Sequence, residues 1–353
     1  MDGRRLYVRA TTKTAARKKL DEIIAAHRQG ATRVTPSTTV AEWMGVYLTG
    51  AELRVGQSLK RRTVDGYQDA ARRYINPLLG PVRLLSLTPE QVEQWHRDLQ
   101  AKGLSAGTVR VAHRVLRSGL QVAVQRGYLA RNVAGLVHAP GYRTVTDALT
   151  RVQAEKLIAA SRRTERLDMG PLRVMLGALC GLRQGEVLAL QVGDLDLDRG
   201  IINVAATLAR PSYRHGPGCS QERHQTARCP TRQAGPVTTT PKSTAGRRQV
   251  PIPGPVLPVV RAHVQALREA RLRVGSQWLT PGDEWLFAGP CGERPDIRGD
   301  ARRWRDLVIA TLGADAPTGT HAARRHAATA YAEGGAPLAE TLRVFGWSKA
   351  DLA

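Results

Sequence analysis

Apolar residues recur at helical spacing over residues 38–131 and predict a domain of four helices without a strand. The first helix presents Val40, Trp43, Met44 and Tyr47, after the candidate caps Thr38 and Thr39. The second presents Val64, Tyr67, Ala70 and Tyr74. The segment Thr88–Gln91 is a capping box with proline at the first helical position, and it begins a helix that reaches Leu99. The fourth helix is expected between Ser105 and Arg126.

Two short regions flank this helical domain. Residues 1–35 predict a short strand and one basic helix, too little to fold alone, so they form either an appended arm or a frayed, solvated terminus. Residues 132–148 contain Pro140, Gly141 and scattered small residues, which predicts a linker.

A second domain is expected over residues 149–353. Its period is helical, interrupted by β-like segments at 200–204 and 248–252, with an insertion rich in Gly, Pro and Arg at 209–239 between them. A third apolar run, at 284–287, fits either a strand or a buried loop. The expected fold class is therefore mainly α with a small β-sheet.

The charge of the chain points to a polyanionic partner. Its 53 Lys and Arg residues against 30 Asp and Glu give a formal net charge of +23, and the basic residues are spread through the whole sequence. Nucleic acid is the expected partner. A membrane-binding helix would need Trp, Phe or Leu opposite its basic face, and the chain has only two Phe.

Three further features predict a cytoplasmic protein. The N-terminus has no apolar core of the signal-peptide kind, and the longest apolar stretch, around 174–182, is too short to cross a bilayer. Four Cys in a chain of this length fit a reducing compartment.

Three arginines recur three or four residues apart on the last helix of the first domain: Arg110, Arg114 and Arg117. Such a stripe is either a solvated face or a surface that follows a phosphate backbone. The net charge favours the phosphate interpretation.

A candidate site for a phosphodiester arises from two arginines far apart in sequence. Arg183 follows an apolar helix expected at 171–182 and has Glu186 three residues later, which either forms a surface ion pair or holds the guanidinium in place. His321 and Arg324 share one helix face, and His321 is either a core histidine or a group at a helix N-terminus that faces an anion. Two guanidinium groups can bind one phosphate and stabilise the charge of its pentacoordinate transition state.

Lys242 is the only lysine between Lys156 and Lys349. An arginine keeps its proton, whereas a lysine of lowered pKa can act as a general acid. Lys242 is therefore a candidate proton donor on a β-hairpin, and the alternative is an ordinary turn lysine.

These motifs, in this order and spacing, resemble the tyrosine recombinase (phage integrase) family. The segment 181–186 resembles its first arginine motif, Lys242 stands where the family has its hairpin lysine, and residues 321–325 and 345–348 resemble its His-x-x-Arg-His and later His-or-Trp motifs. The resemblance runs from about residue 38 to residue 353 and implies catalytic roles for Arg183, Lys242, His321, Arg324 and Trp347, with Glu186 in support.

The resemblance also implies a fold and a reaction. The first domain would be the helical, SAM-like core-binding domain and the second the mixed α/β catalytic domain. DNA at attachment sites would be cut and rejoined without a metal or other cofactor, through a 3′-phosphotyrosyl intermediate within a homotetramer. A basic N-terminal arm binding accessory sites, and a partner protein that bends DNA or sets the direction of reaction, would fit the family, as would a nucleoid-associated location.

Three departures from the family pattern stand out. Arg325 replaces a second histidine and Ala322–Ala323 a more typical Asp-Leu, while Trp347 is an accepted alternative that donates one hydrogen bond. The family's nucleophilic tyrosine follows the last motif by two to three helical turns, and no tyrosine follows Trp347 in the 353 residues. The sequence is therefore expected to be truncated before the nucleophile. Tyr331, the last tyrosine, is expected to be a packing or surface ring rather than the nucleophile.

The insertion holds a second candidate constellation, His215, Cys219, His224 and Cys229. Cys and His at these intervals could bind zinc tetrahedrally, but the spacing lacks a Cys-x2-Cys pair, so a disordered loop without metal is the alternative.

Two functions remain open at this stage. The first is a site-specific recombinase, an integrase of a mobile element. The second is a DNA-binding remnant that kept the fold without cleavage. A basic structural nucleic-acid protein would leave the set of Arg183, Lys242, His321 and Arg324 unexplained.

Overall fold

The computed structural model describes residues 11–17, 34–141, 148–163, 170–209, 213–214, 219, 231, 233–234, 238–239, 246–279 and 284–347. The chain divides into two compact units, Met1–Thr144 and Val145–Ala353. The finer domain limits expected from the sequence stay predictions. None of the described helices is both long and apolar enough to cross a membrane.

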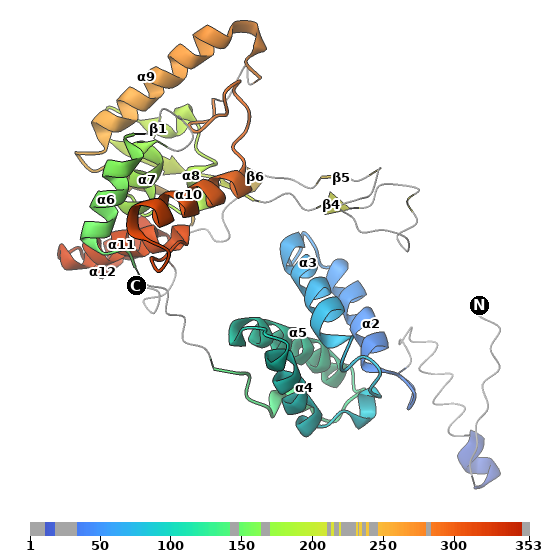
Figure 1. The fold of residues 1–353 in the computed structure, drawn as a ribbon. Coiled ribbons are helices and arrows are strands. Elements are labelled where there is room, and N and C mark those ends of the chain that lie inside the picture. The colour runs from blue at the N-terminus through green and yellow to red at the C-terminus, as the bar shows by residue number, and fades with distance from the viewer. Residues whose placement is uncertain are drawn as a thin grey trace. The chain divides into compact units, whose positions relative to one another are not determined.

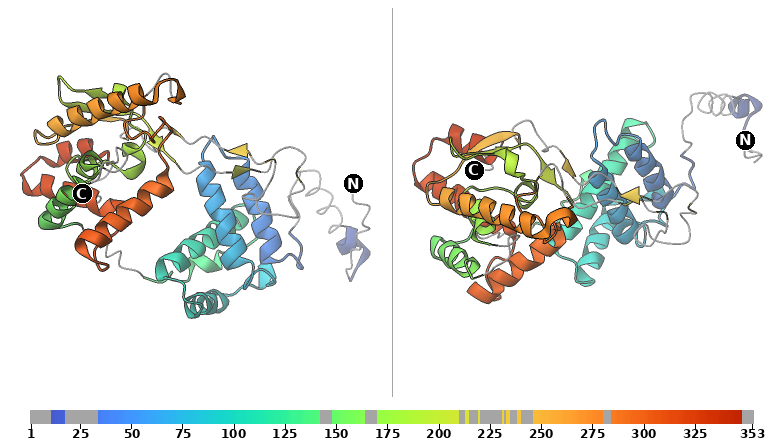
Figure 2. Two further views of the ribbon diagram at one scale, coloured as in Figure 1. Left: turned by 45° about the horizontal axis from the view of Figure 1, so that its top comes forward. Right: turned by 90° about the horizontal axis from the view of Figure 1, so that it is seen from above.

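The described core of the first unit is a bundle of helices without a strand, as Figures 1 and 2 show. Its elements are α2 (Val40–Glu52), α3 (Arg61–Ala70), η1 (Ala71–Ile75), η2 (Leu84–Ser86), α4 (Pro89–Ala101), α5 (Ala106–Gln125) and η3 (Val133–Gly135). The four helices expected from the sequence are present.

Local signals in the sequence begin these helices. Thr39 and Thr88 form complete capping boxes with Glu42 and Gln91, which satisfy backbone N–H groups that have no partner within the helix. The buried indole of Trp43 donates to the carbonyl of Gly119 at 2.9 Å and so ties α2 to α5.

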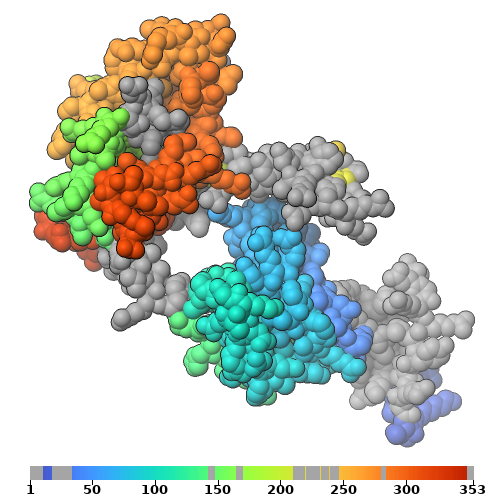
Figure 3. All heavy atoms as spheres, viewed as in Figure 1, coloured from blue at the N-terminus to red at the C-terminus, as the bar shows by residue number. Residues whose placement is uncertain are grey.

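The second unit is mainly helical, with α6 (Arg151–Ser161), α7 (Pro171–Ala178), α8 (Gln184–Val187), η4 (Val192–Asp194), α9 (Leu257–Val274), η7 (Gly275–Gln277), α10 (Ile297–Leu312), α11 (Thr320–Glu333) and α12 (Leu338–Phe345). Helix α9 forms a ridge along the surface of this unit (orange in Figure 3). The main core contains Leu176, Val187, Val260 and Phe345, which come from four different helices.

A small antiparallel sheet completes the second unit and confirms the expected fold class. Its order is β1 (Leu195–Asp196), β2 (Ile201–Val204), β7 (Arg248–Pro251), and the fully buried Ile202 and Val250 face each other in register. The described residues also form two separate two-stranded sheets: β3 (Thr207–Leu208) with β6 (Thr238–Thr239), and β4 (Tyr213–Arg214) with β5 (Gln233–Ala234).

Two local expectations are corrected or settled by the structure. The apolar helix ends at Ala178 rather than at 182, because the chain turns at Gly181, whose φ is +63° and whose Cα lies against the ring of Phe345. The run at 284–287 is a buried loop, in which Trp285 forms an isolated bridge with Gln191.

Candidate active site

One buried carboxylate organises the candidate site. Glu186 lies in α8 and is 3% exposed, and its Oε2 accepts a hydrogen bond from the backbone N–H of Arg183 at 2.9 Å. The guanidinium of Arg183 donates to Oε1 at 2.8 Å, while its side chain remains 35% exposed. Arg183 is therefore held from one side by Glu186 and stays accessible on the other.

Sequence reasoning missed Arg248, the second partner of Glu186. Arg248 in β7 donates to Oε2 at 2.9 Å and to Oε1 at 3.1 Å, and its side chain is 2% exposed. Its Nε also donates to the carbonyl of Val344 at 2.6 Å, which ties the sheet to the end of α12. The signal was present in the sequence as an arginine at an inward position of a strand, since β7 alternates buried and exposed residues.

Arg324 comes to the same carboxylate from α11. It is 4% exposed, its Nη1 lies 4.0 Å from Oε2 of Glu186, and it donates to the carbonyls of Gly181 and Phe345. Its guanidinium carbon stands 5.3 Å from the ring centroid of Phe345. The turn at Gly181 and the end of α12 thus position Arg324.

The charges of this cluster do not balance. The guanidinium groups of Arg183, Arg248 and Arg324 surround the single carboxylate of Glu186, which leaves two positive charges in excess. Burial alone would raise the pKa of Glu186, but hydrogen bonds and charges from Arg248 and Arg183 lower it to about 2. Burial, followed by the charge of Arg183, lowers the pKa of Arg324 to about 9, so it is protonated at neutral pH. An anion bound beside Arg183 would relieve this excess.

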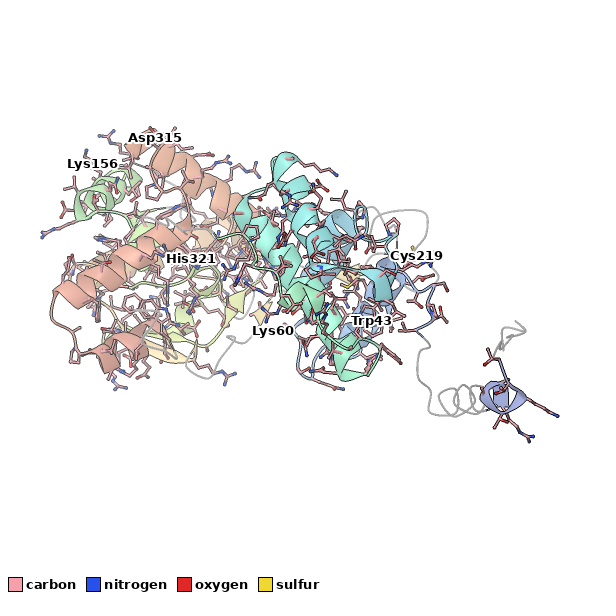
Figure 4. All side chains as sticks on the ribbon, turned by 90° about the horizontal axis from the view of Figure 1, so that it is seen from below. Trp43, Lys60, Lys156, Cys219, Asp315 and His321 are labelled. Atoms are coloured by element: carbon pink, nitrogen blue, oxygen red, sulfur yellow. The ribbon has the colours of Figure 1, made fainter. Side chains whose placement is uncertain are left out.

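His321 joins the cluster from the first turn of α11 (labelled in Figure 4). Burial, and then the charges of Arg324 and Arg183, lower the pKa of its imidazole. The neutral ring has one donor and one acceptor nitrogen, so it can hydrogen-bond a phosphate or pass a proton.

Trp347 follows the C-terminus of α12, where Gly346 adopts the left-handed conformation that ends many helices. Its ring stacks on Phe345 with centroids 5.1 Å apart and lies 5.6 Å from the guanidinium carbon of Arg324. The structure therefore brings together Arg183, Glu186, His321, Arg324 and Trp347.

Tyr331 lies on α11 and is half-buried. Its ring meets Phe345 edge-on, with centroids 5.6 Å apart. Burial and then the charge of Glu340 raise the pKa of its hydroxyl, which is the opposite of what activates a nucleophile. These contacts are those of a packing ring.

Several candidates fall outside the part of the chain that the structure describes: Lys242, His215, His224 and Cys229. Cys219 lies within the described residues. Within the described residues, no group of three or more His, Cys, Asp or Glu is placed to hold a metal ion.

The arginines of the first unit have a different setting. Arg110, Arg114 and Arg117 are all exposed on α5. Their predicted role, contact with a DNA backbone, stays a prediction.

Comparison with known proteins finds integrases along most of the chain. No family model matches it. The integrase of Saccharopolyspora erythraea is 26% identical over 343 residues, with 88% of this chain and 76% of that protein covered. The tyrosine recombinase XerC-like protein of Caldanaerobacter subterraneus subsp. tengcongensis is 25% identical, with 96% and 83% covered.

Solved structures share the fold at lower identity. The integrase of transposon Tn1549, in complex with transposon right end DNA, superposes with a TM-score of 0.67 at 18% identity, covering 89% of this chain and 93% of that one. A lambda integrase dimer bound to a core site gives a TM-score of 0.61 at 16% identity, covering 89% and 97%. With this fold, with integrase relatives along most of its length and with the family's motif residues gathered around Glu186, the chain belongs to the tyrosine recombinase (phage integrase) family.

Proposed function

We propose that the protein is a site-specific recombinase that cuts and rejoins DNA for the integration or excision of a mobile element. The observation that carries this proposal is the buried cluster in which Arg183 and Arg324 share the carboxylate of Glu186 and retain excess positive charge. A phosphodiester approaching a pentacoordinate transition state gains negative charge on its non-bridging oxygens, which this cluster stabilises without reorganising.

Each residue of the site has a proposed task. Arg183, which is partly exposed, binds one non-bridging oxygen of the phosphate. Arg324, which is buried, contributes positive charge from within the protein. The neutral imidazole of His321 and the indole N–H of Trp347 supply further hydrogen bonds. Lys242 gives a proton to the leaving 5′-oxygen. Glu186 orients Arg183, and Tyr331 has no part in the chemistry.

The partners follow from the charge and from related proteins. Double-stranded DNA at attachment sites is the proposed substrate, and the exposed arginines of α5 bind its backbone. Lambda integrase is known as a tetramer bound to a Holliday junction, and we propose a homotetramer on DNA here. A DNA-bending or directionality factor and a nucleoid-associated location belong to the same proposal. The alternative, a DNA-binding remnant that kept the fold without cleavage, would retain the same cluster, so cleavage itself is the measurement that distinguishes the two.

The test separates the phosphate chemistry from the identity of the nucleophile. A duplex bound in a salt-dependent manner is first selected from a random pool with the 353-residue chain. Hydrogen peroxide then serves as an external nucleophile: the hydroperoxide anion bonds to phosphorus, the bond to the 5′-oxygen breaks, and that oxygen takes up a proton.

Scission at one phosphodiester, seen on a denaturing gel, is the expected result. It should be lost in Arg183→Ala and Arg324→Ala and kept in Tyr331→Phe and in Arg151→Ala, which removes an arginine paired with Glu155 on the exposed face of α6. Random breakage, or equal scission by Arg324→Ala, would overturn the proposal.

A further inference from the structure

Arg183 stands at the start of a helix too short to hold itself in place. Helix α8 has four residues, Gln184–Val187, and a single helical turn is unstable in isolation. Its middle is pressed against β3, since a Cβ at Gly185 would lie 2.6 Å from the carbonyl oxygen of Leu208. Its end is held by Glu186, as described above. Val187 packs in the main core, and a further contact is made by the first residue of the helix, Gln184.

Gln184 ties the start of α8 to the start of α10. Its Nε2 donates to Oδ2 of Asp300 at 2.7 Å and to the carbonyl of Ile297 at 3.1 Å. Both hydrogens of the amide thus bind the first turn of α10. The residue bonded in this way is the direct neighbour of Arg183.

Asp300 is held in turn by a buried arginine. Arg173 in α7 is 2% exposed and Asp300 is 0% exposed, and they form a bidentate pair at 2.7 and 2.8 Å. The guanidinium carbon of Arg173 also lies 5.4 Å from the ring centroid of Trp304. A buried ion pair of this kind is weak evidence of stability, because apolar residues often pack as well. What apolar residues could not do here is present an oxygen to Gln184.

Resting on the proposed function, we propose that Arg173, Asp300 and Gln184 are positioning residues for Arg183. The pair Arg173–Asp300 fixes Oδ2 in the core, Oδ2 fixes the amide of Gln184, and this amide sets the direction in which α8 presents the guanidinium of Arg183. None of the three touches the phosphate. Their action is on the geometry of Arg183, where an error of about 1 Å can cost on the order of 100-fold in rate.

Gln184→Met tests the inference most directly, because it keeps the length of the side chain and leaves the Arg173–Asp300 pair intact. The matched control is Gln249→Met, which removes an exposed amide bonded to Asn203 at 3.1 Å in the sheet. We expect Gln184→Met to lower the rate of peroxide scission at saturating protein roughly 10- to 100-fold. The Kd for the selected duplex and the Tm should stay at the parent values, and Gln249→Met should match the parent throughout.

A second readout does not depend on activity. In Gln184→Met the amide hydrogens of Glu186 and Val187, which bond to the carbonyl of Arg183, should exchange faster while those of α9 are unchanged. Unchanged exchange with an unchanged rate would overturn the inference. So would a lower Tm with a normal rate, since that is the behaviour of a structural residue. If the parent chain cuts nothing, the proposed function fails. The exchange measurement still tests whether the hydrogen bonds of Gln184 to α10 hold α8 in place.

Coupling shows whether Arg173 acts through Gln184. Arg173→Lys keeps the charge and loses the bidentate geometry, so it should lower the scission rate several-fold in the parent. In the Gln184→Met background, Arg173→Lys should have no further effect on the rate, because the hydrogen bond from Gln184 to Asp300 is already absent. Independent, additive losses would contradict the proposed path.

Discussion

The two units of the chain bury their polar groups in opposite ways. The first unit keeps the arginines of α5 in solvent and buries two neutral histidines, His96 and His113, which face each other at 3.0 Å. The second unit buries Arg173, Arg248 and Arg324 and compensates them with carboxylates and backbone carbonyls.

This difference separates affinity from chemistry. Water and salt screen the attraction between an exposed arginine and a phosphate. The contribution of each such arginine to DNA affinity is therefore small, and many arginines share it. A buried arginine acts in a poorly solvated region where its charge is strong and its direction fixed. Exposed arginines are therefore expected to contribute affinity for DNA, whereas burial around a shared carboxylate marks the site proposed for the reaction.

The largest effect is expected from removing the charge of the shared carboxylate. Glu186→Gln leaves Arg248 buried without an anion, which should lower the free energy of unfolding by about 3 to 5 kcal/mol. Urea unfolding measures it. The control is Glu155→Gln on the surface of α6, for which about 0 to 1 kcal/mol is expected. Equal effects of the two substitutions would contradict the role given to burial.

Acid should reproduce this loss in part. The folded-state pKa of Glu186 is about 2 and its ordinary value is 4.5. The contribution of its charge to the free energy of unfolding is therefore fully present above pH 4.5. The contribution is lost as the pH falls from there toward 2. Glu186→Gln should remove this part of the pH dependence.

The second effect falls on the reaction. Arg324→Ala should lower the rate of peroxide scission roughly 100- to 1,000-fold, the usual cost of a lost donor to a transition-state oxyanion. The Kd for DNA should change by less than about threefold, because many arginines share the affinity. Equal loss of affinity and rate, measured by anisotropy and on gels, would make Arg324 an ordinary DNA anchor.

The sequence predicted the elements of the first unit well because three of the four expected helices carry their own start signal, whereas α3 has no side-chain cap. Thr39, Thr88 and Ser105 are visible in the sequence, and each caps the helix expected after it. The predicted end of the apolar helix before Arg183 was wrong. The helix ends at Ala178 because the chain turns at Gly181, where Phe345, which is distant in sequence, packs against it. Periodicity cannot show such a contact.

The candidate site was predictable only as far as its motifs. Arg183, Glu186, His321 and Arg324 were named from spacing and Trp347 from the family resemblance, and the structure places them together. Arg248 was missed because a strand arginine next to Arg247 looks like one more basic residue. Its inward position on β7 was the available signal, and its 2% side-chain exposure shows that it is buried. Arg173 and Asp300 lie 127 positions apart, so no local pattern pairs them.

The third effect uses the buried histidines of the first unit. Burial, followed by the charges of His96, Arg117 and Arg110, lowers the pKa of His113 to about 4. Burial also lowers the pKa of His96, which the charge of Glu93 partly opposes. Between pH 6.5 and 4 the unfolded chain therefore binds more protons, so the first unit should lose stability as the pH falls through this window.

The free energy of unfolding of the first unit is expected to fall by about 2 kcal/mol, after allowance for solvent screening. Hydrogen exchange of α4 and α5 should accelerate from pH 7 to pH 4, after correction for the intrinsic pH dependence, before that of α7 and α11 does. A variant with leucine at both positions, His96→Leu with His113→Leu, should lose this dependence. If the exchange of α7 and α11 accelerated at a higher pH than that of α4 and α5, the second unit would be the more acid-sensitive one, which would contradict the prediction.

The smallest effect belongs to the exposed arginines. Arg114→Ala should weaken DNA binding several-fold and reduce the slope of log affinity against log salt by about 1, since one fewer phosphate contact releases fewer counterions. The scission rate at saturating protein and the Tm should not change, because Arg114 touches neither the cluster nor the core. The control is Arg72→Ala, since Arg72 is also exposed but is already bonded to Asp69 at 2.8 Å. An unchanged salt slope in Arg114→Ala would show that α5 has a solvated face rather than a DNA contact, and would leave the origin of affinity to other arginines.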